Sequence, residues 1–266
     1  MNKINSLGLF VGTGQCNARC KHCAGVIHRK YAPKQDGVID TDLIYKTVKN
    51  CYERGARSIS LTSSGEPTLS PLAVTKTLEL ICNMREEDVK YEWINLYSNG
   101  IQIGKDKEFS CKYLRQWHNL GLQTVYITVH NLDEEKNAEV YGIRAYPSLR
   151  EVVSRVHDAE LLARANIVLS RDNIGTYEKY ISMVKGLREI GFNHISAWPI
   201  RNSEDKMDSG LAPLEEELDK MENWTQEQET SGYRLRILRE NSRRAYQTGQ
   251  KLTLFPDGTL SSSWCN

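Results

Sequence analysis

Six short apolar runs alternate with longer amphipathic stretches over the first 200 residues of the chain. Runs of this length that are rich in β-branched and aromatic residues predict strands, here over residues 7–13, 58–63, 93–98, 125–130, 165–170 and 194–200. The stretches between them repeat apolar residues with helical spacing, over residues 41–54, 72–84, 109–120, 148–163 and 176–190. Repeated strand–helix units predict an α/β fold with a parallel sheet and right-handed helical crossovers.

Polar and apolar side chains alternate within the predicted strands, so the two faces of the sheet differ. In the fourth strand Val125, Ile127 and Val129 share one face, and four other strands alternate in the same way. A closed eight-stranded barrel fills its interior with apolar side chains, and a flat parallel sheet covered on both sides is apolar on both faces. The pattern therefore predicts a partial (β/α)6 TIM-like barrel around a solvated site. The alternative, an antiparallel sheet with one solvent-exposed face, is disfavoured by the long helical crossovers.

Residues 201–266 are predicted to extend a core domain of residues 1–200. Two polar helices are expected over residues 214–227 and 233–245, and then a β-hairpin whose turn is the Pro-Asp-Gly of residues 256–258. The second helix would carry Arg234, Arg236, Arg239, Arg243 and Arg244. Because residues three or four apart share a helix face, these arginines would either be solvated or bind an anionic substrate or an acidic peptide.

Composition narrows the possible partners and the compartment. The 266 residues include 35 Lys and Arg and 34 Asp and Glu, a net charge of +1, so no overall field attracts nucleic acid or a membrane surface. No apolar run approaches the roughly 20 residues of a membrane-spanning helix, and the first residues lack the apolar core of a signal peptide. We therefore expect a cytoplasmic protein, in which free thiols and an oxygen-sensitive metal cluster persist.

Three of the seven cysteines, Cys16, Cys20 and Cys23, lie within eight residues directly after the first predicted strand. One loop can point all three thiolates at a single metal centre, and short Cys spacings of this kind are typical of iron–sulfur ligation. The alternative is a zinc site that adds His22 or His28, although no second Cys-x2-Cys half is present. Disulfides are disfavoured, because the number of cysteines is odd and no export signal precedes them.

The Cys-x3-Cys-x2-Cys loop after the first strand resembles that of the radical S-adenosylmethionine (radical SAM) superfamily, most of all its branch for molybdenum-cofactor synthesis and peptide maturation. Further motifs follow in the family's order at the ends of the second to fifth strands. By this resemblance the SAM-binding residues are His22, Ser64, Gly65, Glu66, Pro67, Asn99, Thr128, Arg144, Asn166 and Ser170. Gly65 would let the backbone approach the ligand closely, and Ser64 stands where many family members have another glycine.

The resemblance also implies a mechanism and its cofactors. Cys16, Cys20 and Cys23 would hold a 4Fe–4S cluster whose open iron chelates SAM. An electron, supplied by a donor such as flavodoxin or ferredoxin, would cleave SAM to a 5′-deoxyadenosyl radical. This radical would abstract a hydrogen from a peptide or a small metabolite, with the protein excluding water and oxygen.

The hairpin at residues 251–260 resembles the one that opens the auxiliary-cluster region of peptide maturases, but only Cys265 follows it. A single cysteine cannot hold a second cluster, so that region is expected to be truncated or metal-free. Cys265 is instead a candidate hydrogen-atom donor to a substrate radical, and the simpler interpretation is a tail thiol without a role. Two rival functions stay open: an activase of a glycyl-radical enzyme, and a non-catalytic zinc-binding module.

Overall fold

The computed structural model describes residues 3–23, 25, 40–202, 204, 206–228, 234–239 and 250–262. Within these ranges the chain forms one sheet of nine strands in the order β7-β6-β5-β4-β3-β2-β1-β8-β9. The strands are β1 (Ser6–Phe10), β2 (Ser58–Thr62), β3 (Trp93–Ser98), β4 (Thr124–Val129), β5 (Leu162–Leu169), β6 (His194–Pro199), β7 (Leu235–Ile237), β8 (Lys251–Leu254) and β9 (Leu260–Ser261). Every neighbouring pair except β8–β9 is parallel, which excludes the antiparallel alternative.

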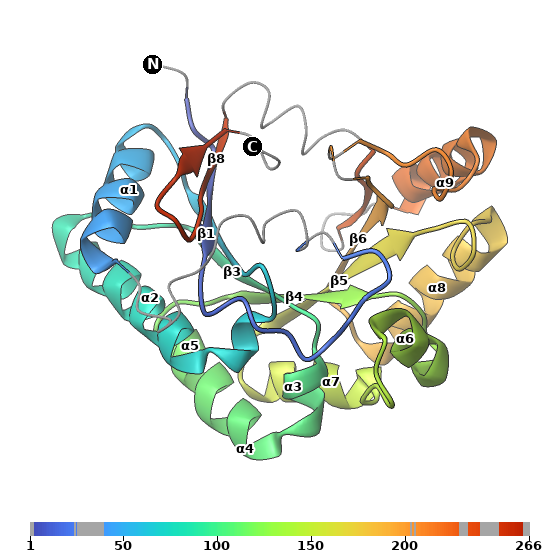
Figure 1. Ribbon diagram of the computed structural model, residues 1–266, viewed down its shortest axis with the longest axis horizontal. Helices are drawn as coiled ribbons and strands as arrows, with labels where there is room; N and C mark the ends of the chain where they lie inside the picture. The colour runs from blue at the N-terminus through green and yellow to red at the C-terminus, as the bar shows by residue number, and fades with distance from the viewer. Residues whose placement is uncertain are drawn as a thin grey trace.

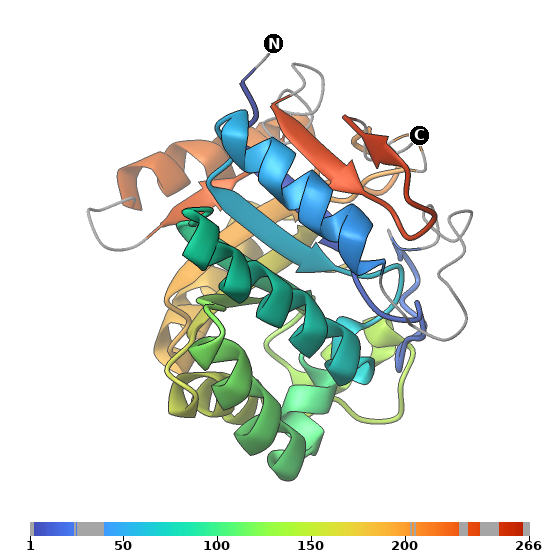
Figure 2. The same ribbon diagram turned by 90° about the vertical axis from the view of Figure 1, so that its left-hand side faces the viewer.

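Helices pack around the outside of this curved sheet, as Figure 1 shows. They are α1 (Thr41–Glu53), α2 (Pro71–Asn83), α3 (Ile101–Lys105), α4 (Lys107–Phe109), α5 (Arg115–Asn119), α6 (Glu134–Tyr141), α7 (Leu149–Asp158), α8 (Tyr177–Ile190) and α9 (Glu215–Gln228). Figure 2 shows α1 and α2 lying side by side along the sheet. The edge strands β7 and β9 are not paired with each other in the described ranges, so the sheet is a partial barrel, as the alternation predicted.

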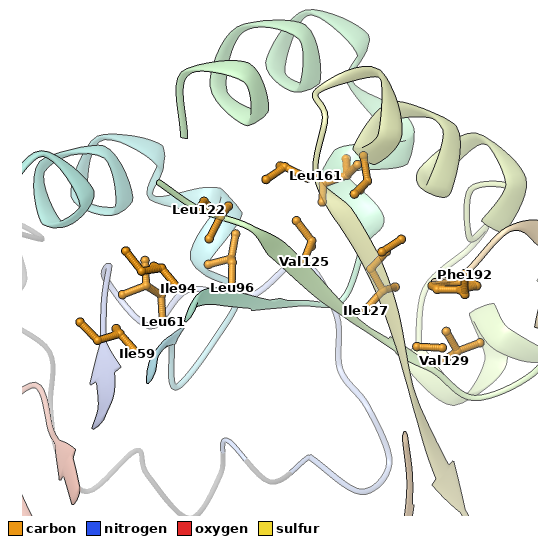
Figure 3. Close-up of a cluster of buried hydrophobic side chains, with 14 of the residues drawn as sticks. Ile59, Leu61, Ile94, Leu96, Leu122, Val125, Ile127, Val129, Leu161 and Phe192 are labelled. Atoms are coloured by element: carbon orange, nitrogen blue, oxygen red, sulfur yellow. The ribbon is translucent and has the colours of Figure 1, made fainter. Parts of the chain in front are cut away.

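The outer face of the sheet, which meets the helices, is apolar. Alternate strand residues such as Ile59, Leu96, Val125 and Ile127 are fully buried in one continuous core, which Figure 3 shows between the strands and the helices. Burial of a side chain of this kind contributes roughly 1.5–3 kcal/mol, so this face holds the layers together. The residues between them point to the inner face, which is where the predicted site lies.

Local signals set several helix ends. Helix α1 begins after Asp40, whose side chain accepts a hydrogen bond from the Leu43 backbone N–H at 3.0 Å, and such a cap satisfies one of the free N–H groups of the first turn. Helix α8 ends at Gly191, whose φ of 109° suits a residue without a side chain. Among the helices of the described residues, none has the length and apolar character needed to cross a bilayer.

One predicted helix is shorter than expected. The helix predicted over residues 148–163 is α7, which ends at Asp158, and β5 begins at Leu162. Between them Glu160 adopts a left-handed backbone conformation with a φ of 61°, which breaks the helical path and turns the chain into the strand. The helix predicted over residues 109–120 is present but contains a π-helical turn, η4 (Ser110–Leu114), between α4 and α5.

The arginine-rich helix predicted over residues 233–245 is wrong for the residues that the structure describes. Residues 235–237 form β7, which pairs in parallel with β6. Leu235 and Ile237 are buried and Arg236 between them is exposed, a period of two that a strand satisfies and a helix does not. Arg243 and Arg244 lie outside the described residues.

The helix predicted over residues 214–227 and the predicted C-terminal hairpin are confirmed. Helix α9 matches the helix expected over residues 214–227, and Arg239 holds it through ion pairs with Glu215, Asp219 and Glu222 at 3.2, 2.8 and 3.1 Å. Strands β8 and β9 form the expected hairpin, with Gly258 at a φ of 91° in its turn. The sequence did not predict that β8 would pair in parallel with β1.

Candidate functional site

The three clustered cysteines lie in a loop that follows β1; residues 11–23 are called the cysteine loop below. Backbone hydrogen bonds tie the loop to two neighbours. The Val11 N–H donates to the Thr62 carbonyl at 2.7 Å, and the Arg19 N–H donates to the Tyr141 carbonyl at 2.8 Å. The loop is thereby held between the end of β2 and the end of α6, although it has no regular secondary structure itself.

The cysteine thiols lie close enough to influence one another electrostatically. Cys16 is exposed, whereas Cys20 and Cys23 are half-buried. Burial raises the pKa of Cys20 to about 12, and the charges of Cys23 and Cys16 add to the rise. Burial likewise raises the pKa of Cys16, with further contributions from Glu66 and Cys23. As thiolates, these three groups repel one another.

This donor set fits a metal cluster. A bound cation offsets the repulsion among thiolates and keeps them deprotonated. A metal centre with several positive charges would therefore stabilise the three thiolates most. Within the described ranges, no three His, Cys, Asp or Glu side chains converge on a point where one metal ion could sit. A cluster needs less convergence than a single ion, because its thiolates bind different iron atoms.

Gly65 is the point at which the segment after β2 meets the cysteine loop. A Cβ atom on Gly65 would lie 2.2 Å from the Gln15 carbonyl oxygen and 2.3 Å from that of Gly14. The neighbouring Glu66 N–H donates to the same Gln15 carbonyl at 2.8 Å. The absence of a side chain at Gly65 therefore allows its close contact with the cysteine loop, and its predicted approach to a ligand stays a prediction.

Glu66 links this segment to the end of β3. Its Oε1 atom accepts hydrogen bonds from Thr68 N–H at 3.1 Å, from Thr68 Oγ1 at 2.7 Å and from Ser98 Oγ at 2.8 Å, and its Oε2 atom accepts from Asn99 N–H at 2.7 Å. Burial raises the pKa of this carboxyl, and the four hydrogen bonds oppose part of that rise. The side chain expected to bind SAM thus binds four donors of the protein.

Asn99 connects β3 back to the cysteine loop. Its Nδ2 atom donates to Asn17 Oδ1 at 2.7 Å and lies 3.9 Å from the Cys16 sulfur, also as a donor. Its Oδ1 atom accepts from the Ile101 N–H at 2.9 Å. Hydrogen bonding to a thiolate favours the charged form, so Asn99 opposes part of the rise that burial causes in the pKa of Cys16.

Ser64 and Pro67 complete this segment. Pro67 is buried and opens a 3₁₀ turn, η2 (Pro67–Leu69), that Glu66 caps. The Ser64 hydroxyl is buried and has no hydrogen-bond partner, and the Ser64 carbonyl lies 2.6 Å from where a Cβ of Gly25 would be. A buried hydroxyl without a partner costs free energy, which a polar ligand beside the loop would recover.

Thr128 and Asn166 lie next to each other on the inner face, because they are paired in register between β4 and β5. Asn166 is buried and Thr128 is half-buried. Ser170, just beyond β5, is buried and donates to Asp172 at 2.6 Å. The structure thus brings Thr128 and Asn166 together at the carboxyl-terminal side of the strands, where barrel enzymes bind their ligands.

Three sequence predictions lie apart from these contacts. His22 is exposed beside Cys23. Arg144 is exposed in the segment after α6 and forms no hydrogen bond or ion pair with another described residue. Cys265 lies outside the described residues, so its proposed donor role stays a prediction.

Sequence reasoning missed the aromatic support behind the site. The Tyr141 and Tyr146 rings stack with centroids 5.1 Å apart. Tyr141 Oη donates to the Thr128 carbonyl at 2.7 Å and Tyr146 Oη donates to the Asn99 carbonyl at 2.7 Å, so the pair holds the ends of β3 and β4. Nothing in the sequence marked Tyr146 as part of this support.

Beside this pair, His130 packs edge-on against Tyr141 at 4.8 Å. Burial, with a smaller contribution from His22, lowers the pKa of His130 to about 4. The ring is therefore neutral near pH 7.

Comparison with known proteins agrees with these motifs. The sequence profile of the Radical SAM superfamily matches residues 10–206. The chain belongs to the radical SAM superfamily. Its cofactors are accordingly a 4Fe–4S cluster and SAM, as the family resemblance implied, and family membership decides against the non-catalytic zinc module.

Curated relatives of this chain include cyclases. A probable GTP 3',8-cyclase of Sulfurisphaera tokodaii is 26% identical over 175 residues, which cover 64% of this chain and 49% of the relative. A GTP 3',8-cyclase of Campylobacter jejuni is 25% identical over 166 residues, which cover 62% of this chain and 47% of the relative. The chain thus spans about half the length of these curated relatives.

Solved structures of other proteins share the fold of this chain. Streptococcus suis SuiB bound to the precursor peptide SuiA superposes with a TM-score of 0.66 at 14% identity, covering 100% of this chain and 60% of SuiB. The enzyme anSMEcpe with bound AdoMet superposes with a TM-score of 0.62 at 16% identity, covering 98% of this chain and 74% of anSMEcpe. These similarities confirm the partial barrel.

Proposed function

We propose that this chain uses SAM bound at a cluster on Cys16, Cys20 and Cys23 to abstract a hydrogen atom from a peptide or small-metabolite substrate. The observation that carries the proposal is the linkage of the cysteine loop to the segment around Gly65 and Glu66. That linkage places the thiols, the orphaned Ser64 hydroxyl and the end of β3 around one location. When bound, the cluster supplies the electron that cleaves SAM to the 5′-deoxyadenosyl radical.

The chain's own residues would position the two ligands. Backbone carbonyls beside Gly65 would accept hydrogen bonds from the SAM ammonium group, since the Glu66 carboxylate is already bonded to protein donors. Thr128 and Asn166 would contact SAM from the inner face, and Ser64 would supply its free hydroxyl. Groups held this rigidly lower the entropic cost of reaching the reactive geometry.

The substrate belongs to the proposal as a class only. The relatives named GTP 3',8-cyclase support a small metabolite, and SuiB with its bound precursor peptide supports a peptide. We further propose that an electron donor such as flavodoxin or ferredoxin reduces the cluster in the cytoplasm. The half-buried loop around Cys20 and Cys23 is the surface at which such a donor would approach.

The test is anaerobic reconstitution with iron and sulfide, followed by reduction in the presence of SAM and mass-spectrometric detection of 5′-deoxyadenosine. Wild type should bind iron and release 5′-deoxyadenosine, and Cys20→Ala should do neither. Cys111→Ala is the matched control, because Cys111 is an exposed thiol on η4, on the helical side of the sheet. Wild type that holds iron but never forms 5′-deoxyadenosine with any reductant would refute the proposed function.

A further inference from the structure

The strands carry basic side chains and no acidic ones. None of the nine described strands contains Asp or Glu. Their charged residues are Arg164 in β5, Arg236 in β7 and Lys251 in β8. Strand register places all three on the inner face, since they pair across the sheet with other inner-face positions. The described strands therefore present only positive charge to whatever occupies that face.

Arg164 is the residue whose surroundings are most fully defined. Its guanidinium group lies over the Tyr126 ring, 4.7 Å from the centroid, and the Tyr97 ring packs edge-on against Tyr126 at 4.8 Å. Its Nη1 atom donates to Tyr126 Oη at 3.3 Å, and its Nη2 atom donates to Ser196 Oγ. These contacts fix the plane of the guanidinium group on the inner face.

The hydrogen bonding of Arg164 is incomplete. A guanidinium group offers five N–H donors, and the buried Nε–H of Arg164 has no acceptor. Arg164 also forms no ion pair with any described carboxylate. A partly desolvated cation without a counter-charge is costly, and a carboxylate or phosphate matches a guanidinium fork bidentately.

The position of Arg164 relates it to the proposed SAM site. Arg164 lies two residues before Asn166 on the same face of β5, a separation of about 6–7 Å along a strand. On the side away from Asn166, the Arg234 guanidinium approaches the Trp93 ring to 6.0 Å. Trp93 is in β3 and Arg234 adjoins β7, with three strands between them in the sheet, so this contact spans the inner face beneath Arg164.

We propose that Arg164 binds an anionic oxygen group of the substrate, a carboxylate or a phosphate, on the inner face between the Thr128–Asn166 pair and the Trp93–Arg234 contact. The proposal rests on the proposed function, which places the substrate on this face. It adds the substrate's chemical class, a molecule with an acidic group. That group would bind one inner-face position along β5 from Asn166, a proposed SAM-binding residue. The neighbouring His194 ring, which pairs with Arg164 across β5 and β6, is consistent with a positively charged site here. Burial lowers the pKa of His194 most, and the positive charges of Arg164 and Arg234 lower it further.

The test uses the full chain and two simple probes, inorganic phosphate and acetate, titrated separately at constant ionic strength. The readout is the NMR signal of the Arg164 side-chain Nε–H, assigned by its loss in Arg164→Lys. Arg57 is the matched control: its guanidinium also lies on a tyrosine ring, 4.2 Å from Tyr52, but already donates to the carbonyls of Tyr52 and Ala56.

We expect a saturable shift of the Arg164 signal and none of the Arg57 signal. Saturation with phosphate alone would mark a phosphorylated substrate, and saturation with acetate would mark a carboxylate. A His194 ring signal reporting the same titration should require at least about tenfold more anion in Arg164→Gln, while Arg164→Lys, which keeps the charge, should lose less. Circular dichroism would confirm that both variants fold.

Two results would overturn the inference: no saturable shift with either anion, or equal shifts of the Arg164 and Arg57 signals. Because this titration needs neither cluster nor SAM, its outcome is separate from that of the deoxyadenosine assay. Wild type that binds anions at Arg164 but forms no 5′-deoxyadenosine would refute only the proposed function. Wild type that forms 5′-deoxyadenosine but shows no anion binding at Arg164 would refute only this inference.

Discussion

Replacing Gly65 with alanine would push the cysteine loop away from the segment that follows β2. The new methyl group would lie 2.2 and 2.3 Å from two backbone carbonyl oxygens of the loop, where ordinary contact begins near 3.4 Å. The loop backbone would have to retreat by about 1 Å, and overpacking of this kind costs about 1–3 kcal/mol. The retreat would also weaken the 2.8 Å hydrogen bond from Glu66 to Gln15, a further loss of about 1 kcal/mol.

Function should suffer more than stability in Gly65→Ala. A misplacement of about 1 Å near reacting atoms can cost on the order of 100-fold in rate. We therefore expect the variant to unfold at moderately lower urea concentration, to bind less iron on reconstitution, and to form 5′-deoxyadenosine on the order of 100-fold more slowly than wild type.

The matched control is Gly8→Ala, in the strand that leads into the same loop. There the nearest atom to a new methyl group is a side-chain oxygen of Thr253 at 3.0 Å, so the contact needs a shift of only a few tenths of an ångström. Gly8→Ala should keep its iron and most of its activity. If Gly65→Ala matched Gly8→Ala in iron content and rate, the contact between Gly65 and the cysteine loop would not control the site.

Three further predictions concern the frame around the site. Because the pKa of His130 is lowered to about 4, this residue should contribute a loss of up to about 3 kcal/mol of unfolding free energy as pH falls from 6.5 to 4 in the metal-free chain, and urea titrations of His130→Phe should show a pH-dependent loss smaller by that amount; equal losses in the two proteins would contradict the lowered pKa. Trp117→Phe should lower the unfolding free energy by about 2–4 kcal/mol, because it leaves a cavity and removes the hydrogen-bond donor to the Thr75 hydroxyl. The control Trp93→Phe, at a 45% exposed position, should lower it by less than about 1 kcal/mol, and equal losses would contradict the prediction. Arg239→Ala should lower the unfolding free energy by about 1 kcal/mol in low salt and by less in high salt, because salt screens its ion pairs with α9. A loss that does not depend on salt would show that these ion pairs do not stabilise the fold.

The sheet and its curvature were predictable because strand periodicity reports directly on the two faces. Val125, Ile127 and Val129 alternate with polar residues, and in a strand this alternation places the apolar residues on one face and the polar residues on the other. The cysteine loop was predictable for a similar reason, since three ligands within eight residues constrain one another locally. In both cases the signal is carried by residues that are neighbours in sequence.

The interior bonding of the site was not predictable, because its partners are far apart in the chain. Glu66 was expected to face a ligand, yet its hydrogen bonds run to Ser98 and Asn99, more than 30 residues away. Likewise β7 was read as a helix, because three residues among many arginines carry little strand signal of their own. Its pairing with β6 is a tertiary effect that overrides local propensity.

The pairing of β8 with β1 has a consequence for biosynthesis. Ser6 and Leu7 leave the ribosome long before their partners Lys251 and Leu252 are synthesised. Until β8 is made, one edge of β1 exposes unpaired backbone N–H and C=O groups together with apolar side chains. Such an edge can pair with strands of other nascent chains. Synthesis that stalls before β8 should therefore produce aggregates seeded at β1.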